Sequence, residues 1–157
     1  MNSNRVNKNK GFTLIEILVV IGIIAVLAAI VIVAINPARQ FAQARNTQRE
    51  SDVSTILNAV GQLMVDNKGA ALSATNCSSI GTLPSSTATN IGTGSDLVNL
   101  SCLAPTYIAS ALPFDPAGDA ADTDYTIKEE STGRYTVCAP KHAEASISGS
   151  TSYCLSR

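Results

Sequence analysis

Four cysteines are the residues of this sequence best suited to covalent cross-linking. Four thiols allow three pairings, and closeness along the chain favours joining the first to the second and the third to the fourth. A zinc site would need paired ligands such as CxxC or two histidines, but His142 is the one histidine. The sequence therefore predicts two disulfides, formed in an oxidising compartment outside the cytoplasm. Their cysteines are Cys77, Cys102, Cys138 and Cys154.

Carboxylates form a second group, in the stretch 112–125, which reads LPFDPAGDAADTDY. Carboxylate oxygens in such a loop are the ligands that Ca²⁺ prefers. The spacing is not that of an EF-hand, and Asp, Gly and Pro also form ordinary turns. We expect no cofactor here, with calcium binding as the alternative. Its ligands would come from Asp115, Asp119, Asp122 and Asp124.

The sequence shows no pattern of an enzyme. It contains no nucleophile–base pair, phosphate-binding loop or metal-hydrolase spacing, so we expect no catalytic site. Lys and Arg number 11 against 12 Asp and Glu, which leaves a net charge of −1. That balance provides no basic field for nucleic acid, and aromatic residues amount to only 4%. We therefore expect no nucleic-acid partner.

The strongest hydropathy signal is the apolar run 12–35, in which Glu16 is the only charged residue. As a helix it would extend about 36 Å, enough to cross a hydrocarbon core of about 30 Å with some tilt. The run is too long for the apolar region of an ordinary secretory signal peptide. The rest of the chain is rich in Ser, Thr, Asn and Ala and lacks the apolar mass to bury such a helix. A membrane-spanning helix that carries a small polar head is the expected organisation.

Basic residues flank the apolar run in equal number, so their count does not set its orientation. The upstream flank carries no acid, and the cysteines lie downstream. Both observations favour an N-terminus in the cytoplasm and a head outside it. The flanking residues are Arg5, Lys8 and Lys10 upstream and Arg39, Arg45 and Arg49 downstream.

The string that begins at Lys10, KGFTLIEILVVIGIIAVLAAI, places a glycine between a basic prefix and the apolar run. Over residues 8–35 it resembles the class III leader of type IV prepilins and type II secretion pseudopilins. The resemblance implies that a membrane-embedded prepilin peptidase cuts between Gly11 and Phe12 and that the new terminus of Phe12 is N-methylated. It further implies a membrane assembly platform and an assembly ATPase as partners, and a homopolymer as product.

The position of Glu16 within the apolar run gives a physical reason, independent of the resemblance, to expect that it has a charged partner. An ionised acid within a membrane costs about 2.5–3.5 kcal/mol, so it needs a partner. Cleavage would create a cationic amine at Phe12, which methylation leaves charged. We expect Glu16 of one subunit to neutralise the Phe12 amine of its neighbour during assembly, where water is scarce. The alternative is that Glu16 reaches the headgroups near the helix end.

Beyond the apolar run, residues 36–69 change to an amphipathic helical pattern. We expect one long helix over about 12–68, with a break at Gly22 or Pro37 and a glycine cap at Gly69. The three downstream arginines are expected on a solvated face. The expected apolar stripe consists of Val53, Ile56, Leu57, Val60, Leu63 and Met64.

Residues 70–157 should form a head of the α+β class. The Ser/Thr-rich segment 70–106 reads as a loop tied down by cysteines. Alternation over 125–128 and 135–138 around the turn 131–133 predicts a hairpin, and 152–155 a third strand. A long hydrophobic N-terminal helix packed on a small antiparallel sheet is also what the pilin resemblance implies.

These patterns divide the chain into a leader (1–11), a membrane or filament-core helix (12–35), an amphipathic helix (36–69) and a head (70–157). The expected function is that of a structural subunit of a type IV pilus-like filament. It would first span the cytoplasmic membrane once and then enter a filament at the cell surface or within the envelope. The alternatives are a secretion pseudopilin, or a minor subunit at a filament tip that binds DNA or surfaces.

Overall fold

The computed structural model describes residues 11–80 and 84–157. The chain divides into two compact units, one ending at Gln40 and the other comprising Phe41–Arg157. We describe each unit by itself. Together they contain a long apolar helix and a small antiparallel sheet, which is the expected α+β class.

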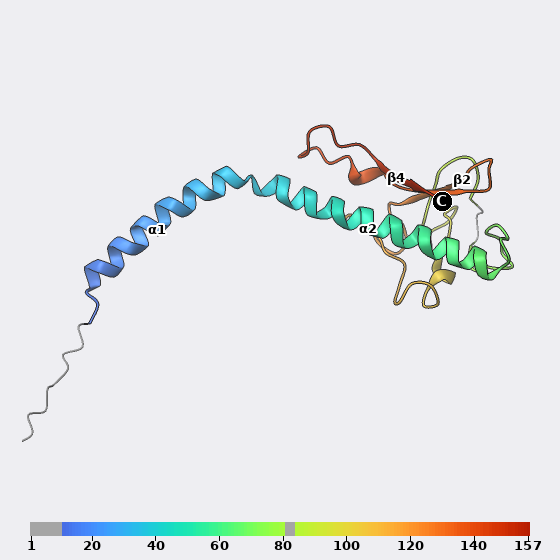
Figure 1. Ribbon diagram of the computed structural model, residues 1–157, viewed down its shortest axis with the longest axis horizontal. Helices are drawn as coiled ribbons and strands as arrows, with labels where there is room; N and C mark the ends of the chain where they lie inside the picture. Colours follow the sequence, from blue (N-terminus) through green and yellow to red (C-terminus); the bar gives the residue numbers. More distant parts are fainter. Residues whose placement is uncertain (1–10, 81–83) are drawn as a thin grey trace, which may run out of the picture. The chain divides into compact units, whose positions relative to one another are not determined.

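Helix α1 comprises Leu14–Ile35 in the first unit (Figure 1). Thr13 precedes it in extended conformation, and its side chain caps the first turn. None of the helix residues is buried, and its large apolar side chains are all exposed by half or more. By length and composition, α1 is the one helix in the described residues that could cross a membrane.

The helical run is interrupted at Asn36, which adopts a left-handed conformation with φ 49°. Helix α2 then begins at Pro37 and continues to Asp66. The side-chain oxygen of Asn36 accepts a hydrogen bond from the Arg39 amide at 3.4 Å, so Asn-Pro forms a cap followed by a proline in the first turn. The expected break therefore falls beside Pro37. A break at Gly22 is wrong, because α1 is continuous through that residue.

Helix α2 contributes one side of the core of the second unit. Its apolar stripe is buried as expected, with Met64 at the edge. The helix ends in a turn where Lys68 and Gly69 both have positive φ, and the Gly69 amide donates to the Met64 carbonyl at 2.7 Å. This bond is part of a Schellman motif. Lys68 takes the left-handed position that glycine most often occupies, and Gly69 follows it.

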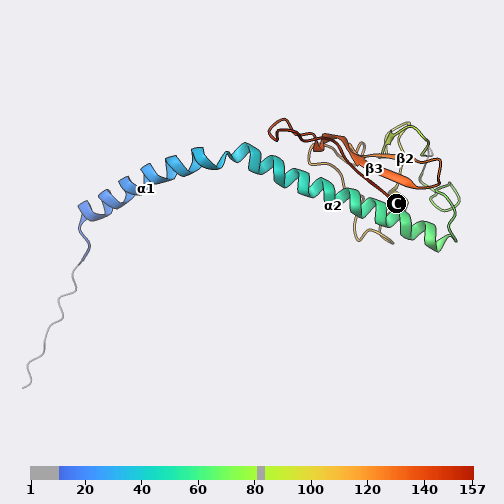
Figure 2. The same ribbon diagram turned by 45° about the horizontal axis from the view of Figure 1, so that its top comes forward.

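The sheet has four antiparallel strands in the order β1-β2-β3-β4. In both views the longer strands lie beside the C-terminal half of α2, as Figure 2 shows for β2 and β3. The hairpin and the third strand match the expectation, whereas the two-residue first strand was not expected. The strands are β1 (Thr89–Asn90), β2 (Thr126–Glu129), β3 (Tyr135–Ala139) and β4 (Tyr153–Ser156).

Strand register determines which side chains face the core. Ile127, Val137 and Leu155 lie opposite one another and pack into the core with the α2 stripe. Because side chains alternate along a strand, the neighbouring positions point to the opposite face. Cys138 and Cys154 are direct register partners on that outer face.

The acidic loop 112–124 is held against residues 91–94 by backbone hydrogen bonds. The Gly94 amide donates to Ala121 at 3.0 Å, and the Thr123 amide donates to Ile91 at 2.9 Å. At Gly92 a Cβ atom would collide with the Ala121 carbonyl, so only glycine permits this approach. The loop is thus fixed to the head at one end of the short strand β1.

Candidate functional site

The first candidate site is the junction between leader and helix. Gly11 and Phe12 are exposed and precede the first turn of α1. The other leader residues, 1–10, lie outside the described residues. Exposure of this backbone is what a peptidase needs in order to reach it, but cleavage between the two residues stays a prediction.

Glu16 is bonded back to the start of its own helix. Its carboxylate accepts hydrogen bonds from the Thr13 amide and the Thr13 hydroxyl, both at 2.8 Å. The Glu16 amide in turn donates to the Thr13 hydroxyl at 3.3 Å. Together these bonds form a capping box, which satisfies backbone donors that the first helical turn leaves free.

Thr13 is the N-cap of α1, a role not among the expectations from the sequence. The signal was present, since a threonine followed three residues later by a glutamate before an apolar run is the capping-box pattern. Its presence means that Glu16 has a local partner within the single chain. Any partner from another subunit would have to compete with Thr13 or add to it.

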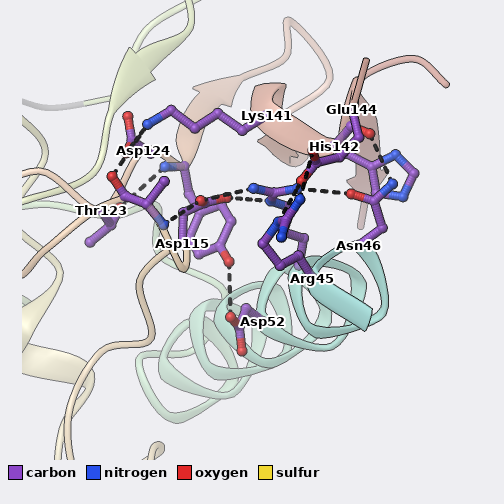
Figure 3. A network of polar contacts seen from close by, with 12 residues as sticks. Arg45, Asn46, Asp52, Asp115, Thr123, Asp124, Lys141, His142 and Glu144 are labelled. Atoms are coloured by element: carbon purple, nitrogen blue, oxygen red, sulfur yellow. Dashed lines mark hydrogen bonds and ion pairs between the residues drawn. The ribbon is translucent and has the colours of Figure 1, made fainter. Parts of the chain in front are cut away.

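The second candidate site is a polar network in the head (Figure 3). Its hydrogen bonds include four from Arg49. Arg49 is 2% exposed, and its guanidinium contacts Asp115 through two nitrogens, at 2.5 and 3.1 Å. It also donates to Glu144 at 2.7 Å and to the Asn46 side chain at 2.9 Å. Arg49 therefore joins α2 to the acidic loop and to the segment that follows β3.

The expectation of three solvated arginines is wrong for Arg49. Arg45, one turn earlier, is partly exposed and donates to both oxygens of Glu144 at 2.8 and 3.0 Å. Arg39 is exposed. The buried face of α2 continues toward its N-terminus past the apolar stripe, and there it carries Asn46 and Arg49 in place of aliphatic residues.

Charge pairing shifts the pKa values in this network. Hydrogen bonds from Arg45 and then Arg49 lower the pKa of Glu144 from 4.5 to about 2. Burial is the largest single influence on Asp115 and acts to raise its pKa. The hydrogen bonds from Arg49 and the Ala117 amide, together with the charges of Arg49 and Lys141, more than offset burial and hold the pKa below its ordinary value. Both carboxyl groups are therefore ionised partners of the arginines at neutral pH.

The pKa of a third carboxyl group, that of Asp52, shifts in the opposite direction. Asp52 on α2 accepts a hydrogen bond from the buried Tyr125 hydroxyl at 2.8 Å. Burial raises the pKa of Asp52, and the nearby charge of Asp115 adds to the effect. The hydrogen bond between Asp52 and Tyr125 joins α2 to the residue that precedes β2, so Asp52 has a structural role.

The four aspartates proposed as calcium ligands are engaged with the protein itself. Asp115 pairs with Arg49, and Asp124 pairs with Lys141 at 2.5 Å. Asp119 accepts amide hydrogen bonds within the loop, and Asp122 accepts from the Asn90 side chain. Among the described residues, no three His, Cys, Asp or Glu side chains are grouped to hold one metal ion.

All four cysteines are joined in disulfides, in the arrangement that closeness along the chain favours. Cys77–Cys102 closes the Ser/Thr-rich loop near the core. Cys138–Cys154 links β3 to the last strand β4. The cysteines thus stabilise the head at two separate places.

Comparison with known proteins identifies the N-terminal part of the chain. Residues 6–32 match the family model described as the prokaryotic N-terminal methylation motif. No curated protein and no solved structure matches the chain. The match includes Gly11, Phe12, Thr13 and Glu16, the residues of the capped junction. Residues 6–32 therefore carry a prokaryotic N-terminal methylation motif, which agrees with the resemblance of this segment to the class III prepilin leader.

Proposed function

We propose that this chain is a structural subunit of a type IV pilus-like filament, cut after Gly11 and polymerised through α1. The observation that carries the proposal is an apolar helix with no buried residue, placed directly after a prepilin-type leader. Such a surface needs an apolar environment. Lipid provides it before assembly, and the helices of other copies provide it afterwards.

In this proposal the N-terminus lies in the cytoplasm and the disulfide-bonded head outside. A prepilin peptidase removes the leader, and a membrane platform driven by an assembly ATPase extracts the helix from the bilayer. The subunit's role is structural and not enzymatic. The motif's presence, the lipid-compatible α1 and the two disulfides support this sequence of events.

Glu16 would act in the step that brings α1 helices together. Within the filament core its carboxylate faces few water molecules, so the charged amine of a neighbouring Phe12 is the partner that neutralises it best. The capping box holds the Glu16 carboxylate at the start of the helix, close to the level of Phe12. Capping and charge pairing are thus two separable roles of one side chain.

The test is a pair of substitutions at position 16. Glu16→Gln retains an oxygen that can accept from the Thr13 amide but has no charge, whereas Glu16→Ala loses both functions. We expect both variants to be cut after Gly11 and neither to enter filaments. N-terminal peptide mass spectrometry reports cleavage, and electron microscopy of sheared cell-surface material reports assembly.

Glu50→Gln is the matched control, since Glu50 is an exposed acid on α2 outside the apolar run. It should assemble as the natural chain does. Normal filaments from Glu16→Gln would show that Glu16 acts only as a cap and would remove the charge-pairing mechanism. Absence of the natural chain from every filament fraction would remove the proposed function itself.

A secretion pseudopilin is the second candidate, favoured by the sequence Leu-Pro-Phe-Asp-Pro at 112–116. This sequence resembles a loop of major pseudopilins, and here its aspartate is the buried partner of Arg49. The two candidates differ in where filaments form. Long surface filaments at natural expression levels would support the pilus, and filaments confined to the cell envelope would support the pseudopilus.

A further inference from the structure

The two disulfides of the head differ in their access to solvent. Cys77 is completely buried and belongs to the core, and its sulfur lies 3.8 Å from both the Ser79 hydroxyl and the Asn99 carbonyl. Cys154, by contrast, is exposed, and its partner Cys138 is half-buried. Cys102, the partner of Cys77, is half-buried. The first bridge therefore joins a buried cysteine to a half-buried one, whereas the second joins a half-buried cysteine to an exposed one.

Strand register explains the exposure of the second bridge. Val137 and Leu155 face the core, so the adjacent residues Cys138 and Cys154 face outward. β4 is the last strand of the sheet, and only β3 pairs with it among the described strands.

We infer that Cys138–Cys154 is a thiol–disulfide exchange site whose ligand is a dithiol reductant and whose attacked atom is Cys154 Sγ. The incoming thiolate forms a bond to Cys154 Sγ, and the S–S bond breaks to release Cys138 as a thiolate, which takes up a proton. The second thiol of the reductant, as its thiolate, then attacks the mixed disulfide and releases the Cys154 thiolate, which is protonated in turn. Two electrons pass from the dithiol, which becomes a cyclic disulfide, to the protein.

Opening this bridge leaves the core of the head in place but loosens its terminal strand. β4 keeps its ladder to β3, including the hydrogen bonds between Tyr135 and Arg157 in both directions at 3.0 Å. It loses the covalent link that closes a segment with a sequence separation of 16. The Cys77–Cys102 bridge continues to hold the Ser/Thr-rich loop. The outcome is a redox-sensitive C-terminal strand on an otherwise folded head.

The first experiment uses the full chain in detergent, exposed to a limiting amount of dithiothreitol under native conditions. New thiols are alkylated at time points and located by peptide mass spectrometry. We expect Cys138 and Cys154 to be labelled about tenfold or more faster than Cys77 and Cys102, because attack requires access to a sulfur. Equal rates for the two pairs, or faster labelling of Cys77 and Cys102, would overturn the inference.

The second experiment identifies the sulfur that is attacked, with a matched pair of single variants. Cys138→Ser leaves Cys154 as a free thiol, and Cys154→Ser leaves Cys138 free. We expect iodoacetamide to modify Cys154 in the first variant about three- to tenfold faster than Cys138 in the second. The reverse order would assign the attacked sulfur to Cys138 and contradict the proposal. Denatured samples of both variants should react alike, which controls for intrinsic reactivity.

Discussion

The guanidinium of Arg49 contacts carboxylates from two segments far from it in sequence, Asp115 and Glu144. Its burial could have been inferred from spacing alone. The buried positions of α2 recur at steps of three and four, and the same steps continue from the aliphatic stripe to Arg49. The charge of Arg49 nevertheless led to the expectation of an exposed side chain. The carboxylates that neutralise this charge come close to Arg49 only when the chain folds. The positions concerned are Ala42, Asn46, Arg49, Val53, Ile56, Val60 and Leu63.

Substitution of Arg49 by methionine should destabilise the head strongly. It leaves the Asp115 carboxylate buried with no guanidinium partner, and breaking a buried pair in this way costs about 3–5 kcal/mol. Arg45→Met is the matched control, since Arg45 is more exposed and its loss should cost about 1 kcal/mol or less. All four tyrosines lie in the head, so their near-ultraviolet circular dichroism follows its unfolding. Equal loss of stability in both variants would contradict the assigned burial.

Acid should unfold the head through the same residues. The pKa of Glu144 falls from 4.5 to about 2 in the folded chain, so its contribution to stability is complete above about pH 4.5. That contribution is lost as the pH decreases from about 4.5 toward 2. We expect the melting temperature of the head to fall across this interval. Glu144→Gln should lower the melting temperature at pH 7 and flatten its dependence on pH, whereas an unchanged slope would exclude Glu144 from the transition.

Among the secondary-structure elements, the sequence predicted those that are determined by residues close together along the chain. The hairpin of β2 and β3 follows from alternation around a glycine turn, and Gly133 adopts the positive φ that such a turn uses. Strand β1 has only two residues, and it exists because the chain packs against β2 from far away in sequence. Such a short strand carries no periodicity of its own, so the sequence could not indicate it.

The helix break at Asn36 should depend on Asn36 and Pro37 together. Asn36 tolerates the left-handed conformation, and a residue before proline is disfavoured in a helix. Replacement of both residues by alanine should make position 36 helical, which the Cα chemical shift of residue 36 reports for the full chain in detergent micelles. Gly22→Ala, within the unbroken helix, should leave that shift unchanged. A non-helical shift in the double variant would mean that other residues cause the break.

Calcium should leave the acidic loop unaffected if protein groups already satisfy its carboxylates. Asp115 and Asp124 are paired with Arg49 and Lys141, and a cation at the loop would have to displace them. We expect millimolar calcium to change the melting temperature of the head no more than magnesium does. A rise specific to calcium that disappears in Asp124→Ala would instead establish the loop as a calcium site.

The whole molecule combines two units with opposite solvent requirements. The first presents an apolar helix without a buried residue, and the second has a closed core with two disulfides. In the described residues of the head, every buried side-chain nitrogen and oxygen has a hydrogen-bond partner. The second unit thus encloses its own apolar core, whereas the first exposes an apolar surface that is unfavourable in water.

The sequence alone predicted the exposed apolar helix and the N-terminal motif, because the first depends on contiguous composition and the second on a short string of residues. It predicted the apolar core stripe and the two disulfides for similar local reasons. It did not predict the Arg49 network, since Asp115 and Glu144 reach Arg49 only through tertiary packing. It also missed the Thr13 cap, although there the residues themselves carried the signal.

Peptide mass spectrometry of the N-terminus in sheared surface filaments tests the central claim most directly. The filaments should come from cells that express the natural chain and possess a prepilin peptidase. We expect the terminal peptide of the assembled subunit to begin at N-methylated Phe12, with residues 1–11 absent. Assembled subunits that still carry residues 1–11 would contradict the account, as would a processed chain that remains in the membrane fraction and never in filaments.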